Sequence, residues 1–294
     1  MVGREVVRRS VTNVADTAET YSASVTGLSG IQATVRPSTI TVGPGRTASF
    51  RVRFTALNDA TYGRFSTGTL TWTGSHGHRV GSPVVVEPVR LSARPEVTGS
   101  AGDGSLRVDG TSGVAGDIAV SSAGLVGAAP VRLTLAPAPI DLAHPTQGRG
   151  TAVSHYDVPR GTAALRFDVR ADAADDVDLF VYRQGTLVSS SAGPGGHEQV
   201  TIDTPAPGRY DVYVNDFAAA NGLSAAATFT GWVLPGSRAG RAAESLSVRP
   251  NPVPVSLGAP FDYTASWSGL DTGLRWFGAI SYHGSDAMTY VTVN

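Results

Sequence analysis

Short runs of alternating apolar and polar residues recur along almost the whole chain. In residues 48–54 every second position is apolar, and residues 208–214 show the same alternation. Strict alternation over four to eight residues is typical of a β-strand with one buried face, because successive side chains point to opposite sides. No window keeps the 3.6-residue apolar period over enough residues for a long helix. The pattern therefore predicts an all-β protein built from tandem antiparallel β-sandwiches.

Turn residues separate the predicted strands at intervals of about 8–12 residues, the spacing of antiparallel sandwiches. The last group of strands is small for an independent sandwich, so residues 108–125 are a candidate source of strands that complete it. The predicted strands are 9–14, 20–25, 31–37, 40–42, 48–54, 68–73, 84–86, 164–169, 177–182, 199–202, 208–214, 226–233, 246–248, 261–267, 276–280 and 290–293.

Two stretches break the strand pattern and suggest domain boundaries. Residues 91–110 become rich in glycine around Gly99–Gly104, and residues 136–150 carry Pro137, Pro139 and Pro145. Such composition suits connections better than core elements. The predicted division is a first sandwich over 1–92, a linker with strands for the last sandwich over 93–150, a second sandwich over 151–235, and a C-terminal sandwich segment over 236–294.

Composition and charge exclude several classes of protein. The 294 residues carry 23 basic residues, all of them arginine, against 24 acidic ones, for a net charge of −1. That balance provides no global basic field for nucleic acid, so none is expected as a partner. No apolar run approaches the ~18 residues of a membrane span. The absence of cysteine excludes structural disulfides, thiolate zinc sites and cysteine nucleophiles.

Motifs of a known family follow one another along the chain. They are Arg9-Ser10-Val11-Thr12-Asn13-Val14, Val35-Arg36-Pro37-Ser38, Gly68-Thr69-Leu70-Thr71-Trp72-Thr73, His78-Arg79-Val80-Gly81-Ser82-Pro83, Asp175-Asp176-Val177-Asp178-Leu179-Phe180-Val181-Tyr182, Thr204-Pro205-Ala206-Pro207-Gly208-Arg209-Tyr210-Asp211-Val212-Tyr213-Val214, Trp267-Ser268-Gly269-Leu270 and Arg275-Trp276-Phe277-Gly278. Residues 7–90 resemble the fibronectin type III-like domain that follows the catalytic domain of many secreted subtilisin-like serine proteases. Residues 151–233 are similar to the prepeptidase C-terminal domain of bacterial secreted proteases, and the chain's end resembles the tail of long subtilases.

The resemblance implies fibronectin III- or Ig-like and jelly-roll-like sandwiches. It also implies a non-catalytic, secreted accessory region that stabilises a subtilisin-like endopeptidase and aids substrate or surface binding. The partners would be the catalytic domain of the same polypeptide and protein substrates. In that family a further strand and a signal peptide lie upstream, so the first sandwich is expected to lack its first strand. The alternative is a stand-alone extracellular binding or adhesion module.

Two short motifs superficially match the catalytic segments of subtilases. Gly110-Thr111-Ser112 imitates the start of the serine motif, and His76-Gly77-His78 imitates the histidine motif. Such a protease needs an aspartate, a histidine and a serine in one constellation. Here no aspartate motif precedes the histidine, and the serine lacks its usual following residues. The chain itself is therefore predicted not to be an enzyme.

The acidic run Asp172, Asp175, Asp176 and Asp178 is the only concentrated charge group in the sequence. Calcium takes six to eight oxygen ligands, which closely spaced carboxylates can supply. Asp175, Asp176 and Asp178 are therefore calcium candidates, although no cofactor is required. Strand alternation would place Asp176 and Asp178 on one face and Asp175 on the other. The alternative is a solvated strand start whose carboxylates cap a turn.

Overall fold

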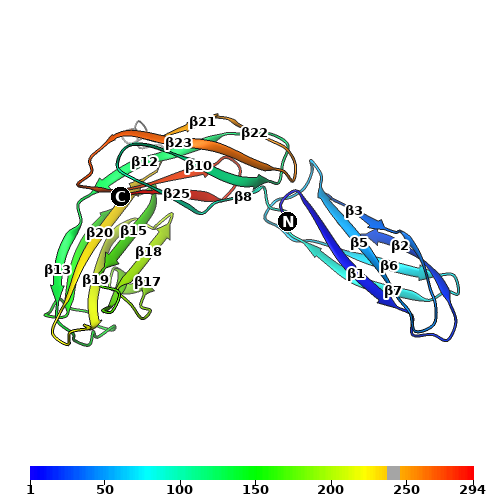
Figure 1. The fold of residues 1–294 in the computed structure, drawn as a ribbon, viewed down its shortest axis with the longest axis horizontal. Helices are drawn as coiled ribbons and strands as arrows, with labels where there is room; N and C mark the ends of the chain where they lie inside the picture. The colour runs from blue at the N-terminus through cyan, green and yellow to red at the C-terminus, as the bar shows by residue number, and fades with distance from the viewer. Residues whose placement is uncertain (237–245) are drawn as a thin grey trace.

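The computed structural model describes residues 1–236 and 246–294, and every regular element in these residues is a β-strand. The all-β prediction is confirmed. Three sandwiches follow one another in space, and the middle one of the arch in Figure 1 is built from two separate stretches of chain. We call them the N-terminal sandwich (residues 1–86), the split sandwich (91–128 and 246–294) and the inserted sandwich (131–235).

The N-terminal sandwich packs two antiparallel sheets with the strand orders β1-β5-β3 and β4-β2-β6-β7. In β5 the side chains of Phe50, Val52 and Phe54 are buried while Arg51 and Arg53 are exposed, as the alternation predicts. The strands are β1 (Arg4–Thr12), β2 (Glu19–Thr26), β3 (Ile31–Arg36), β4 (Thr39–Val42), β5 (Thr47–Ala56), β6 (Ser66–Gly74) and β7 (Arg79–Val86).

One side of the N-terminal sandwich is open. β1 and β7 are the edge strands of their sheets, and a hollow between them is lined by core residues that include Val7, Phe50, Leu70 and Val84. The core itself includes the edge-to-face pair of Phe50 and Trp72, whose ring centroids lie 5.0 Å apart. The open side is where the unpaired backbone groups of two edge strands face solvent.

The split sandwich joins strands that are more than a hundred residues apart in the sequence. β10 pairs with β23 from Gly102 opposite Leu270 to Thr111 opposite Pro260, and β12 pairs with β24. Its sheets have the orders β21-β23-β10-β8, β12-β24-β25-β9 and β11-β22. The strands are β8 (Leu91–Ala93), β9 (Glu96–Gly99), β10 (Gly102–Ser112), β11 (Gly116–Ile118), β12 (Val120–Ala128), β21 (Ser247–Arg249), β22 (Val253–Val255), β23 (Pro260–Leu270), β24 (Arg275–Tyr282) and β25 (Met288–Val293).

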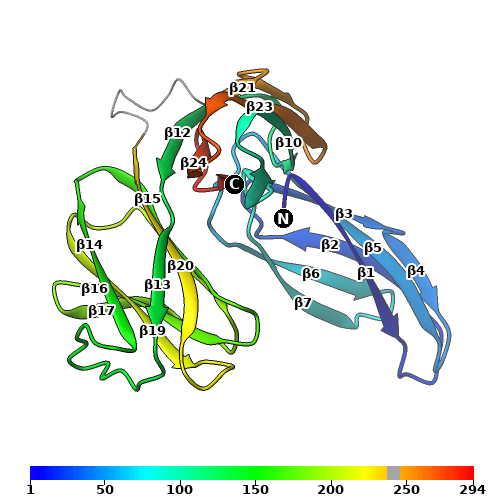
Figure 2. The ribbon, with the colours of Figure 1, turned by 60° about the vertical axis from the view of Figure 1, so that its left-hand side comes forward.

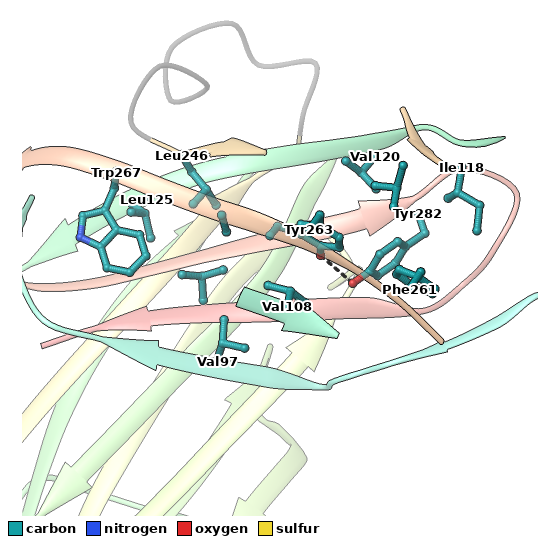
Figure 3. Close-up of a cluster of buried hydrophobic side chains, with 14 of the residues drawn as sticks. Val97, Val108, Ile118, Val120, Leu125, Leu246, Phe261, Tyr263, Trp267 and Tyr282 are labelled. Atoms are coloured by element: carbon teal, nitrogen blue, oxygen red, sulfur yellow. Dashed lines mark hydrogen bonds between the residues drawn. The ribbon is translucent and has the colours of Figure 1, made fainter. Parts of the chain in front are cut away.

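Aromatic side chains fill the split sandwich (Figure 3). The hydroxyl groups of Tyr263 and Tyr282 are 2.7 Å apart in its interior, and both side chains are almost fully buried. Trp267 lies against the backbone of Gly99 and Gly104, where a Cβ atom at either position would come within 2.7 Å of the indole ring. The glycine-rich stretch predicted as a boundary is therefore part of the core, because only residues without a side chain admit this tryptophan.

The inserted sandwich consists of sheets with the orders β13-β20-β15-β18 and β14-β19-β16-β17. β13 pairs with β20, so residues 131–135 lie in this sandwich, whereas the sequence placed the whole of 93–150 in a linker and in the last sandwich. The strands are β13 (Val131–Leu135), β14 (Thr151–Val158), β15 (Thr162–Arg170), β16 (Asp176–Arg183), β17 (Thr186–Ser191), β18 (His197–Asp203), β19 (Gly208–Ala218) and β20 (Ala225–Pro235).

Candidate functional site

The inserted and split sandwiches meet at a junction (Figure 2), where buried charged side chains of β9, β15 and β24 form a network. It begins with β15, whose residues 164–169 alternate in the sequence but are all buried. Leu165, Phe167 and Val169 face the core of the inserted sandwich, while the opposite face contacts the split sandwich. A strand covered on both faces can keep charged residues only if they are paired, and Arg166 and Asp168 both are.

Arg166 is buried and bridges the two sandwiches. Its Nη1 and Nη2 atoms donate to the two carboxylate oxygens of Glu96 on β9, at 2.6 and 3.0 Å. Nη1 also donates to the Thr292 hydroxyl at 3.0 Å. The guanidinium carbon lies 4.3 Å from the ring centroid of Phe277 and 4.9 Å from that of Tyr290. A bidentate carboxylate and two aromatic faces satisfy this cation on every side.

Asp168 is the matching buried anion. Its Oδ1 accepts from Arg275 Nη1 of β24 at 2.6 Å and from Arg170 Nε at 3.0 Å, and His197 Nε2 lies 3.0 Å from Oδ2. Burial alone would raise the pKa of Asp168, but the hydrogen bonds from Arg275 and Arg170 outweigh it, so the pKa lies below its ordinary value. Asp168 therefore stays ionised and holds β24 against β15.

Apolar side chains surround these charges. Trp232 and Leu234 of β20 pack against Phe277 and Ala279 of β24, and the rings of Trp232 and Phe277 are 5.9 Å apart. Trp232 Nε1 donates to the backbone oxygen of Arg275 at 3.1 Å. Sequence reasoning missed this junction, because Arg166 and Asp168 look like the exposed positions of an alternating strand.

The serine and histidine of the protease-like motifs have local structural partners. Ser112 is fully buried, and its hydroxyl donates to the backbone oxygen of Val114 at 2.8 Å while accepting from the Val114 amide at 3.1 Å. His78 Nδ1 lies 2.6 Å from Glu19 Oε2, and the amide of His76 donates to Glu19 Oε1 at 2.8 Å. The two motifs thus close turns in two different sandwiches.

Glu19 is a buried carboxylate that sequence reasoning did not single out. The hydrogen bond with His78 is the main reason why the pKa of Glu19 falls to about 2, and the amide of His76 and the hydroxyl of Tyr21 add to the effect against the cost of burial. Glu19 also occupies the space beside Gly74, where a Cβ atom would lie 2.0 Å from Oε1. His76 and His78, which resemble a histidine motif in the sequence, therefore form the outer end of a hydrogen-bond network around the buried Glu19.

The three calcium candidates lie at the start of β16 and differ in their surroundings. Asp175 Oδ1 accepts from the amide of Ala220 at 2.8 Å, and Asp176 Oδ1 accepts from the amide of Gly195 at 3.2 Å. Asp178 lies within the strand, opposite Asn215 of β19. Burial raises the pKa of Asp178 to about 6, with smaller contributions from the nearby Asp176 and Glu198 carboxylates.

A fourth carboxylate, Asp216, belongs to the same neighbourhood. It is fully buried, and its Oδ1 has no hydrogen-bond partner. Burial, together with the nearby charges of Asp175 and Asp176, raises the pKa of Asp216. Across residues 1–236 and 246–294, however, no three histidine, cysteine, aspartate or glutamate side chains converge closely enough to hold a metal ion. The carboxylates are neighbours but do not form a ligand set.

Within the described parts of the chain, no helix is long and apolar enough to cross a membrane.

Comparison with known proteins identifies the N-terminal sandwich. The family model described as "Fibronectin type-III domain" matches residues 1–86. Two Arabidopsis thaliana proteins, "Subtilisin-like protease SBT2.5" and "Subtilisin-like protease SBT2.6", are 39% and 38% identical over 85 residues. The match covers 29% of this chain and 10% of each of those proteins, so the chain spans about a tenth of the curated relatives.

Solved structures add little to this result. Secreted serine protease VesC from Vibrio cholerae aligns at 13% identity with a TM-score of 0.25, covering 80% of this chain and 48% of VesC. The Pseudomonas aeruginosa CupB2 chaperone aligns at 12% identity with a TM-score of 0.24, over 73% of this chain and 92% of the chaperone. These TM-scores are too low to establish a shared fold. Residues 1–86 are a fibronectin type III-like domain that is homologous to part of subtilisin-like proteases.

Proposed function

We propose that this chain is the non-catalytic accessory region of a secreted subtilisin-like serine endopeptidase. The observation that carries the proposal is the 39% identity of 85 residues to a subtilisin-like protease, within the fibronectin type III-like match at residues 1–86. In this proposal the three sandwiches follow the catalytic domain in the same polypeptide, stabilise it and aid the binding of protein substrates or surfaces. Residues 151–233, which form most of the inserted sandwich, would be its prepeptidase C-terminal-like domain.

A non-catalytic role is supported by the partners of the residues that imitate catalytic motifs. The Ser112 hydroxyl is engaged with both backbone atoms of Val114, and no part of it is exposed. His78 is paired with Glu19, in the N-terminal sandwich. A hydrolytic serine must reach its substrate and be deprotonated by a histidine beside it. A stand-alone extracellular binding module remains the alternative to the accessory region.

The test uses an antibody raised against this chain and a fluorophosphonate probe for active serine hydrolases. Both are applied to the proteins that the native host secretes. We expect a band much heavier than 30.3 kDa that reacts with both reagents, because the proposal places these sandwiches behind a working protease. A band near 30.3 kDa that does not take the probe would contradict the accessory role and favour the stand-alone module.

A second proposal is that calcium binds at the start of β16. The unpartnered, buried Oδ1 of Asp216 supports it, since such an oxygen lacks the donor that its burial demands. Asp175, Asp176 and Asp178, with Asp216 beside them, would hold the ion once their side chains move together, since no three of them converge among the described residues. The ion would neutralise carboxylates that now repel one another.

Melting in millimolar calcium, compared with melting in a chelator, tests the calcium proposal. Binding to the folded state alone would raise the melting temperature by several degrees, and Asp216→Asn would remove that rise. Asp117→Asn, at an exposed position of the split sandwich, is the matched control and should leave it intact. A rise below about 1 °C in the unmodified protein would rule the site out.

A further inference from the structure

The outward face of the β1-β5-β3 sheet carries five arginines and no acidic residue. The strand register places Arg8 opposite Arg51 and Arg51 opposite Arg36, so that one row of arginines crosses all three strands. Arg53 lies in the next outward row, beside Val6 and Thr34, and Arg4 lies in the row beyond it. All five arginines are exposed. We call this surface, formed by Arg4, Arg8, Arg36, Arg51 and Arg53, the arginine face.

None of these five arginines forms an ion pair with a described carboxylate. Among the described residues, every ion pair between an arginine and a carboxylate lies in the split or inserted sandwich. Charge is also divided unevenly along the chain. Residues 1–90 contain ten arginines and five acidic residues, whereas the remainder contains thirteen arginines and nineteen acidic residues. The overall charge of −1 therefore conceals a basic N-terminal sandwich attached to an acidic remainder of the chain.

The opposite sheet of the same sandwich shows that this fold does not require arginines on its surface. The outward positions of its central strands, β2 and β6, carry only hydroxyl side chains: Thr20, Ser22, Ser24, Thr26, Thr67, Thr69, Thr71 and Thr73. Both sheets bury one face in the same core and expose the other to solvent. The arginine face consequently differs from its counterpart in charge and not in architecture.

The chemistry of the arginine face selects among anionic ligands. A guanidinium binds the oxygens of sulfate, carboxylate or phosphate groups through two parallel hydrogen bonds. Neutral hydrogen-bonding side chains lie between the arginines, and these suit the hydroxyl groups of sugars. They are Ser10, Gln32, Thr34, Ser49 and Thr55.

Other polyanions fit the arginine face less well. Its outward positions include no aromatic side chain on which a nucleic-acid base could stack. Val6 is its one apolar residue, which leaves no anchor for a bilayer or for the hydrophobic centre of a protein interface. We propose that the arginine face binds a linear acidic polysaccharide.

The geometry suits a chain that bears repeated charges. Neighbouring strands are about 4.8 Å apart, and outward residues on one strand are about 7 Å apart. Two adjoining hollows lie over this grid, one around Arg8, Arg36 and Arg51 and the other around Arg4 and Arg53. Several charged groups of one polymer can therefore be held at once. Such binding releases counterions and must weaken as salt rises.

The test measures binding of the whole chain to heparin and to polygalacturonate by titration calorimetry over a range of salt concentrations. The variant Arg8→Gln/Arg36→Gln/Arg51→Gln removes the row that crosses the sheet. The matched control Arg132→Gln/Arg149→Gln/Arg160→Gln removes the same charge from exposed arginines of the inserted sandwich. Arg4→Gln/Arg53→Gln is a second variant, to be used if the first is found unfolded by circular dichroism.

We expect the unmodified chain to bind both polysaccharides and the triple variant to lose at least about tenfold in affinity, with a salt dependence shallower by about two to three in slope. The control triple variant should change the affinity less than about twofold, since salt screens exposed charges that lie far from the bound polysaccharide. Equal losses in the two triples, or no binding by the unmodified chain, would overturn the proposal. So would equal or tighter binding to duplex DNA, polyphosphate or phosphatidylglycerol vesicles. None of these results depends on a link to a protease.

Discussion

The split sandwich meets its two neighbours through junctions of opposite character. Toward the inserted sandwich it uses Trp232, Phe277 and the buried charges of Arg166 and Asp168. Toward the N-terminal sandwich the contacts are mainly between backbones. The segment that joins them is held at both ends, because the amide of Val89 donates to the Met1 oxygen at 2.9 Å and the amide of Gly113 donates to the Arg90 oxygen at 2.7 Å. The loops containing Gly3 and Gly258 also approach closely.

The side-chain contacts of this second junction are few. The Tyr62 hydroxyl donates to the backbone oxygen of Gly113 at 3.0 Å, and Leu257 packs against the N-terminal core. Two domains unfold cooperatively when their interface buries large apolar groups and paired charges. Two domains joined by only a few backbone hydrogen bonds can move relative to each other. The comparison indicates one rigid body formed by the split and inserted sandwiches, with the N-terminal sandwich attached through a softer joint.

The largest test of this contrast is Trp232→Ala. Removing a fully packed tryptophan costs about 3–5 kcal/mol in the free energy of unfolding, because the cavity adds to the lost burial. Calorimetry should show the split and inserted sandwiches unfolding separately in the variant but together in the unmodified protein. Trp72→Ala, in the core of the N-terminal sandwich, is the control and should leave their joint transition unchanged. Separate transitions in the unmodified protein would contradict the rigid body.

The next largest effect is expected from Arg166→Met. The change leaves the Glu96 carboxylate without its bidentate partner, which costs about 3 kcal/mol for a largely buried pair. Arg107→Met removes the ion pair between the exposed residues Arg107 and Asp262 and should cost much less, because solvent screens that pair. Chemical denaturation measures both. Equal losses in the two variants would show that burial of Arg166 adds nothing to the junction.

Acid should loosen the first junction and spare the second. Because the pKa of Asp168 in the folded protein lies below its ordinary value of 3.8, the ionised carboxylate stabilises the folded state above that pH. The stabilisation is lost as the pH falls below 3.8 and through the lowered value. Hydrogen exchange at pH 5 and pH 3 should therefore show β15 and β24 losing protection, beyond the intrinsic effect of pH.

Asp168→Asn separates this effect from general acid denaturation. The variant should already show weak protection of β24 at pH 5 and a smaller further loss at pH 3. Backbone amides at the second junction, such as that of Val89, serve as the internal reference, since no carboxylate side chain contributes to the contacts described for that junction. A loss of protection in Asp168→Asn as steep as in the unmodified protein would assign the acid response to other groups.

The smallest effect is expected from Tyr62→Phe. Loss of one partly buried hydrogen bond costs about 0.5–1.5 kcal/mol, and here only the attachment of the N-terminal sandwich is weakened. Small-angle scattering should show a wider distribution of particle dimensions, with melting of the other two sandwiches unchanged. If the distribution of particle dimensions is unchanged and the melting temperature of the split sandwich falls, the second junction is part of the rigid body.

Local patterns in the sequence were sufficient to predict most of the strands, although β8, β9, β13, β14, β17 and β22 were not among those predicted. The alternation in residues 48–54 and 208–214 appears as β5 and β19, since the two-residue period of a strand depends only on neighbours in the chain. The fibronectin type III-like domain was also evident from its motifs, and comparison confirms it over residues 1–86. The sequence by itself thus determined the fold class and the identity of the first domain.

Tertiary structure alone decided which strands pair and which polar residues meet. Gly102 lies opposite Leu270, and no local pattern specifies a partner so far along the chain. The same alternation leaves Arg51 and Arg53 on an open surface but covers Arg166 and Asp168, because a second sandwich packs on β15 and no other described part of the chain packs on the outward face of β5. A strand's period fixes which side chains share a face, and only the packing of whole sheets determines whether that face meets water or protein.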